Sequence, residues 1–147
     1  MSEQFDPQDL RSMIDYMEHT GETDSSDVML AFVENSLFLT AQAHHWHLQC
    51  NVYATHMELD DFYKELPEFV DAFIEGLMAE RGPIYPTGNS YVFQPLDAAI
   101  AILEEYLVHA QHIREYLDQS EQFGSVNTIE DIISFVDSVL YKLKFLR

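Results

Sequence analysis

Hydrophobic positions recur three and four residues apart along most of this chain, the spacing that places side chains on one face of an α-helix. The pattern extends over four long segments: 26–49, 51–82, 96–122 and 128–147. A shorter segment after Asp6-Pro7 has the same spacing, with proline in an early-turn position, and ends at Gly21. The sequence therefore predicts a chain that is almost entirely helical.

In the first long helix, the apolar row predicts which side faces the protein interior. The expected interior row comprises Leu30, Val33, Leu37, Ala41 and Leu48. The expected solvent side comprises Glu34, Gln42 and Gln49. His44 falls on the apolar row and His45 on the polar side, so His44 is the histidine that this pattern places inside.

The second long helix has the clearest interior stripe: Leu59, Phe62, Tyr63, Leu66, Val70, Phe73 and Leu77. Asn51 can cap its start, and Thr55 with Glu58 offers a capping box as an alternative. Pro67 lies inside the segment. Because proline removes a backbone donor and clashes with the preceding turn, it predicts a kink or break near residues 63–66.

The connection at 82–95 contains Pro83, Pro86, Gly88 and Pro95. At about 3.3 Å per residue it can reach roughly 45 Å, the length of a thirty-residue helix. Such a crossover permits the third helix to run parallel to the second. Gly124-Ser125 is expected to end the third helix, and the fourth to begin at about Thr128. We predict an all-α, ferritin-like four-helix bundle with one long crossover. It forms a single domain, 1–147, with a helical N-terminal extension at 1–22.

The formal net charge of −19 is the main compositional feature. Such a chain should repel nucleic acid and anionic membranes and attract cations or basic proteins. The chain has no run of eighteen apolar residues and no charged-then-apolar leader, so we expect a soluble, cytoplasmic protein. The single cysteine, Cys50, has no internal partner for a disulfide, in agreement with a reducing compartment.

Five residues with metal-binding side chains stand out: His44, His56, Asp60, Asp71 and Glu75. A mixed nitrogen and oxygen set suits iron, manganese or zinc better than calcium. His56 and Asp60 are four residues apart, as are Asp71 and Glu75, so each pair shares a helix face. The two pairs lie roughly 22 Å apart along one helix, too far to hold one ion. Either each chain has two incomplete sites, or a two-fold partner completes them.

The run His45-Trp46 … His56 … Asp60 … Asp71 … Glu75 resembles the Dps-type mini-ferritins. That family has a histidine late in its first long helix, then His-x-x-x-Asp, and Asp-x-x-x-Glu eleven residues after that aspartate. The resemblance implies a ferroxidase that oxidises Fe²⁺ with peroxide or oxygen and stores the ferric product. It also implies dimers that assemble into a dodecameric cage, with the site divided between two chains.

Carried over to this chain, the resemblance makes five residues the catalytic metal ligands. His44, His56 and Asp60 come from one chain, and Asp71 and Glu75 from its partner. Iron is the expected metal, with zinc or manganese as alternatives. Many members of the family bind DNA through a lysine-rich tail, but the first ten residues here contain no lysine or arginine. We therefore expect no DNA binding.

The sequence leaves open which histidine of the first long helix is the ligand and which function the protein has. The family's tryptophan directly follows its ligand histidine, which would select His45. A second resemblance, through Leu48-Gln49, Tyr53-Ala54 and His56, is to small ferritin-like proteins of unassigned function in tailed phages, and there His47 is the notable histidine. The rival functions are a ferritin-like scaffold without turnover and a non-enzymatic acidic protein that binds a basic partner or mimics DNA. The usual intrachain di-iron arrangement needs Glu-x-x-His on two helices, whereas Glu105 and His109 are four apart.

Overall fold

The computed structural model describes residues 25–85 and 89–147. These residues form four long helices and one 3₁₀ turn: α2 (Ser25–Gln49), α3 (Tyr53–Arg81), η1 (Leu96–Ala98), α4 (Ala99–Gln119) and α5 (Phe123–Phe145). The described ranges contain no strand, so the prediction of an all-α chain is confirmed. The predicted N-terminal helix and the extension 1–22 lie outside the described residues.

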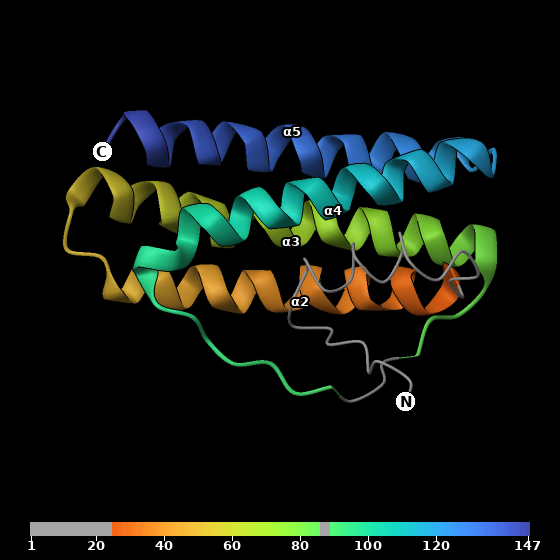
Figure 1. Ribbon diagram of the computed structural model, residues 1–147, viewed down its shortest axis with the longest axis horizontal. Coiled ribbons are helices and arrows are strands. Elements are labelled where there is room, and N and C mark those ends of the chain that lie inside the picture. Colours follow the sequence, from red (N-terminus) through yellow and green to blue (C-terminus); the bar gives the residue numbers. More distant parts are fainter. Residues whose placement is uncertain (1–24, 86–88) are drawn as a thin grey trace, which may run out of the picture.

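The four helices pack side by side as a bundle, and neighbours around it run antiparallel (Figure 1). Helix α2 packs against α3, α3 against α5, and α5 against α4. Figure 1 shows α4 running in the same direction as α3, because the chain returns along the length of the bundle before α4 begins. No helix in the described part of the chain is long and apolar enough to cross a membrane.

Helix α3 buries the side that its sequence predicts. Six of the seven residues of the expected stripe are fully buried, and Tyr63 is half-buried. The helix continues without a break through Pro67, whose ring lies on the exposed surface. The predicted start was wrong. Val52 occupies the N-cap position and no side chain caps the helix, so neither Asn51 nor the Thr55 capping box is used.

Helix α2 is rotated relative to the prediction. Leu37 and Leu48, expected inside, are 52% and 71% exposed. Glu34 and Gln42, expected in solvent, are 7% and 2% exposed. The residues that fill the core from this helix are instead Phe32, Leu39, Ala43 and Trp46.

The crossover explains this rotation, because its residues cover the polar side of α2. The amide of Gln42 accepts a hydrogen bond from the Gln94 backbone N–H at 2.6 Å and donates one to the Gln94 carbonyl at 3.1 Å. The carboxylate of Glu34 accepts hydrogen bonds from Asn89 and Tyr91. Backbone groups outside helices need partners, and Gln42 supplies them for Gln94, while Glu34 bonds side chains of the same segment.

The corner between α4 and α5 also differs from the prediction. Helix α5 begins at Phe123, so Gly124 and Ser125 lie in its first turn, and Glu121 makes the corner with a positive φ of 58°. The Ser125 hydroxyl donates to the Glu80 carboxylate at 2.8 Å, and a Cβ at Gly124 would lie 3.1 Å from the other carboxylate oxygen. The Glu80 carboxylate thus lies at the N-terminus of α5, where the helix dipole favours a negative charge.

His109 of α4 is a polar side chain inside the core. It is fully buried, neither ring nitrogen has a hydrogen-bond partner among the described residues, and the ring stands edge-on to Phe32 at 4.9 Å. Burial, with a smaller contribution from His112, lowers the pKa of His109 to about 3. The folded protein therefore holds this imidazole in its neutral form over the whole physiological range.

Replacing His109 with leucine should stabilise the fold and change its response to acid. Removing an unsatisfied buried polar group should raise the free energy of unfolding by about 1 kcal/mol. In the wild type, unfolded chains take up a proton at His109 below about pH 6.5, whereas folded chains do so only near pH 3. Stability linked to His109 is therefore lost as the pH falls through this window, and His109→Leu should lack that loss. Urea unfolding of both proteins between pH 4 and 7 measures the free energy of unfolding at each pH. If that free energy fell equally in the two proteins as the pH was lowered, the prediction would be contradicted.

Candidate functional site

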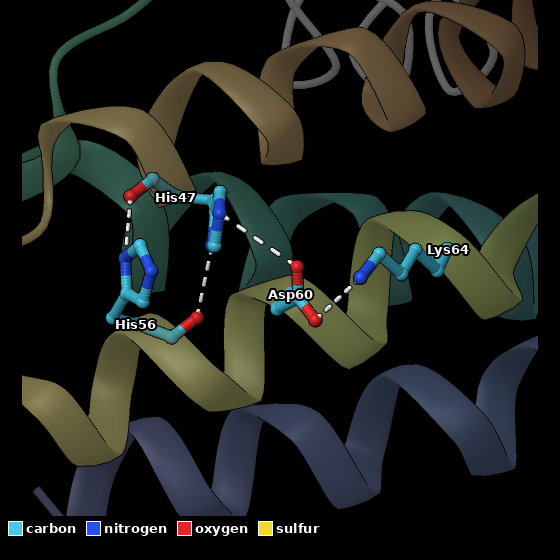
Figure 2. Close-up of polar contacts among 4 residues, drawn as sticks. All are labelled: His47, His56, Asp60 and Lys64. Carbon is cyan, nitrogen blue, oxygen red and sulfur yellow. Dashed lines mark hydrogen bonds and ion pairs between the residues drawn. The ribbon is translucent and has the colours of Figure 1, made fainter.

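A pair of histidines joins the end of α2 to the start of α3. His47 lies in the last turn of α2 and His56 in the first turn of α3, and a short corner brings the two together. The Nδ1 atom of each ring lies within hydrogen-bond distance of the other residue's backbone carbonyl, at 3.0 and 2.9 Å (Figure 2). The two rings also stack, with centroids 3.8 Å apart.

This reciprocal pairing determines which ring nitrogens carry protons. A carbonyl oxygen only accepts hydrogen bonds, so Nδ1 must be the donor in both rings. In a neutral imidazole the other nitrogen, Nε2, then keeps its lone pair. A histidine that binds a metal is commonly oriented in this way, by donating its other ring N–H to a carbonyl or carboxylate. His47 and His56 are therefore both arranged to offer Nε2 as a ligand atom.

Asp60 lies one turn beyond His56, beside the ring of His47. One carboxylate oxygen is 3.7 Å from His47 Nε2, and the other accepts a hydrogen bond from Lys64 Nζ at 2.7 Å (Figure 2). The hydrogen bond from Lys64 lowers the pKa of the Asp60 carboxyl. An anionic carboxylate thus lies beside the imidazole of His47. Lys64 is largely exposed, so solvent screens its ion pair and the lysine can be displaced.

The structure brings His56 and Asp60 together with His47 rather than with His44. His44 is exposed, and its ring stacks on Tyr63 at 4.1 Å and lies 6.1 Å from the His47 ring. His45 stacks instead on Phe93 of the crossover. The rotation of α2 is the reason, since it turns His47 inward and His44 outward.

Asp71 and Glu75 remain apart from this group. Both are exposed, about three and four turns beyond Asp60 along the same side of α3. Among residues 28–85 and 89–147, no three histidine, cysteine or acidic side chains lie close enough together to hold a metal ion. Sequence reasoning also overlooked Lys64, although its spacing of four from Asp60 is the signal for an ion pair on a helix.

Several apolar side chains of α2 and α3 are exposed to solvent. Leu37, Leu48, Met57 and Met78 are exposed to between 37% and 71%. Leu37 and Thr40 of α2 line a groove with Pro67 and Asp71 of α3, with a volume of about 440 Å³.

Residues 47–143 match a protein family whose function is unknown, DUF5856, and the chain therefore belongs to that family. The match begins at His47 and includes His56, Asp60, Asp71 and Glu75, whereas His44 precedes it. Comparison with curated proteins and with solved structures gave no match.

Proposed function

We propose that this member of the DUF5856 family is a ferritin-like protein. It binds Fe²⁺ at sites shared between two-fold-related chains and oxidises it with peroxide or oxygen. The observation that carries the proposal is the His47–His56 pair, in which both Nδ1 atoms bond backbone carbonyls and the Nε2 atom of His47 lies beside the Asp60 carboxylate. In this proposal His47 takes the place that the sequence assigned to His44.

The positions of the acidic residues support a shared site. The point midway between Glu65 and Leu66 on α3 is also midway between Asp60 and Asp71, and midway between His56 and Glu75. If two α3 helices packed antiparallel around that point, each Asp60 would face an Asp71 and each His56 a Glu75. One isologous contact then completes two identical sites, each with two imidazoles and three carboxylates.

The surroundings of that point suit such a contact. Ile74 and the exposed Met57 and Met78 lie on the same side of α3 as the ligands, and the exposed Leu37 of α2 lines the neighbouring groove. The crossover between the parallel helices α3 and α4 supports a ferritin-like arrangement, since such bundles have one long crossover. We propose the two-fold dimer as the functional unit, and assembly into a dodecameric cage stays a prediction.

In this proposal Fe²⁺ is the substrate. Neutral imidazoles and carboxylates bind it, and the carboxylates offset the additional charge as it becomes Fe³⁺. Two Fe²⁺ ions give two electrons, which with two protons reduce one peroxide molecule to two water molecules. An arriving ion displaces Lys64 from Asp60. The protein's charge of −19 raises the local cation concentration, and Zn²⁺ or Mn²⁺ would compete for the same ligands.

The test is oxidation of Fe²⁺ by the purified protein. Iron is added anaerobically, followed by peroxide or air, and the ferric absorbance is recorded against buffer. The variants His47→Ala, His56→Ala and Asp60→Asn should each lose about tenfold or more, as losses of metal ligands do. Asp61→Asn serves as the matched control, because Asp61 is the adjacent acidic residue and is exposed.

Two outcomes would contradict the proposal. If the wild type oxidised iron no faster than buffer, the non-enzymatic acidic protein or the inactive scaffold would be the better description. If His44→Ala were inactive and His47→Ala fully active, the ligand of α2 would be His44, as the sequence pattern first indicated.

A further inference from the structure

A second concave site lies on the other side of α2. It is a cavity of about 260 Å³ between α2, α4 and the crossover. Phe38 and Leu39 of α2, Tyr91 of the crossover, and Ile102, Glu105 and Tyr106 of α4 form most of its wall. Helices α2 and α4 make few contacts with each other, and residues 91–94 of the crossover close the space between them.

Most polar groups at this wall are already bonded within the protein. Both ends of the Gln42 amide bond the backbone of Gln94. The Tyr106 hydroxyl is 2.8 Å from the Ser36 hydroxyl. Glu105 differs: it is half-buried, and no hydrogen bond or ion pair joins its carboxylate to another of the described residues.

A carboxylate that has no partner among the described residues, at a largely apolar wall, favours a particular class of ligand. A charge partly removed from water is stabilised by an opposite charge, so the site favours a cation. A single carboxylate is a poor site for Ca²⁺ or Mg²⁺, which take about six or more oxygen ligands. The aromatic and aliphatic side chains of the wall instead suit an organic cation with an apolar body.

We propose that this cavity binds a small primary amine, whose ammonium group pairs with Glu105 and whose hydrocarbon body lies against Phe38, Leu39 and Ile102. The volume is slightly below the range of about 300–1,000 Å³ found for most small-molecule sites, so the body is short, on the order of six carbons. The net charge of −19 excludes anionic ligands from the vicinity. The site is separate from the His47–His56 pair and does not depend on the proposed iron chemistry.

The test compares three probes of equal chain length, hexylamine, hexanol and hexanoate, by ¹H–¹⁵N NMR at about physiological ionic strength, where surface charges are screened. Hexylamine should shift the amide signals of Gln94 and Ala98 in a saturable way, and hexanoate should leave them unchanged. Glu105→Gln should weaken hexylamine binding about tenfold and abolish the preference over hexanol. Glu115→Gln, an exposed position on the same helix, is the matched control and should bind as the wild type does.

Three results would overturn the proposal. One is equal binding of hexylamine and hexanol, which would show an apolar cavity without charge selection. Another is equal weakening by Glu105→Gln and Glu115→Gln, which would show general attraction to an acidic surface. The third is the absence of a saturable shift with any probe. Ala98→Leu places a larger side chain in the cavity wall, so it should also block hexylamine.

Discussion

Mixing the His56→Ala and Asp71→Asn proteins should restore about a quarter of the wild-type iron oxidation, although neither variant is active alone. In a shared site, His56 and Asp71 come from different chains. A dimer with one chain of each kind therefore has one site in which both changes fall together and one that is fully intact. Random pairing makes about half of the dimers mixed, and each mixed dimer has one working site of two.

The experiment requires the chains to exchange, so the two proteins are unfolded together and refolded before iron is added. The matched control mixes His56→Ala with Asp60→Asn. Both changes lie in the same half of the site, so every mixed dimer keeps two damaged sites and no activity should return. If the wild type is active but neither mixture recovers, the ligands come from one chain and the dimer arrangement is wrong.

Trp46→Ala should remove a large part of the protein's stability. The indole is fully buried, and its Nε1–H donates to the Gln94 carbonyl at 3.0 Å and the Pro95 carbonyl at 3.1 Å. Truncating a buried tryptophan lowers the free energy of unfolding by about 3–5 kcal/mol. A typical domain has only about 5–15 kcal/mol in total. The change should therefore leave the protein marginally folded.

Urea unfolding followed by circular dichroism at 222 nm measures this loss. Trp46→Phe separates the contribution of packing from that of the hydrogen bonds, because phenylalanine retains much of the ring but cannot donate to the crossover. This variant should lose about 1–3 kcal/mol of the free energy of unfolding. Tyr53→Ala, an aromatic residue that is 78% exposed, is the control and should change stability little. An equal loss in the phenylalanine and alanine variants would show that the hydrogen bond to the crossover outweighs packing.

Much of the bundle was predictable because a helix with one apolar side buries that side against its neighbours. The interior stripe of α3, from Leu59 to Leu77, packs into the core mainly against α2 and α5, so its apolar period identifies the buried side directly. The length of the connection at 82–95 likewise predicted that the chain could return along the bundle. The spacing of His56, Asp60, Asp71 and Glu75 placed them on one side of α3, and their exposure or half-burial agrees with that placement.

Helix α2 could not be oriented in this way. Its two sides face different environments, since one packs on the helical core and another lies under an extended segment whose backbone needs hydrogen bonds. Glu34 and Gln42 are buried because they bond that segment, and Leu37 and Leu48 remain outside. A periodicity argument treats polar residues as exposed, so it reversed these two sides and chose His44.

The sequence alone thus determined the all-helical class, the interior stripe of α3 and the candidate residues on that helix, because these depend on local spacing. Only the tertiary structure decided that His47 meets His56 and Asp60. That choice depends on how α2 is rotated, and the rotation follows from hydrogen bonds to residues about fifty positions away along the chain.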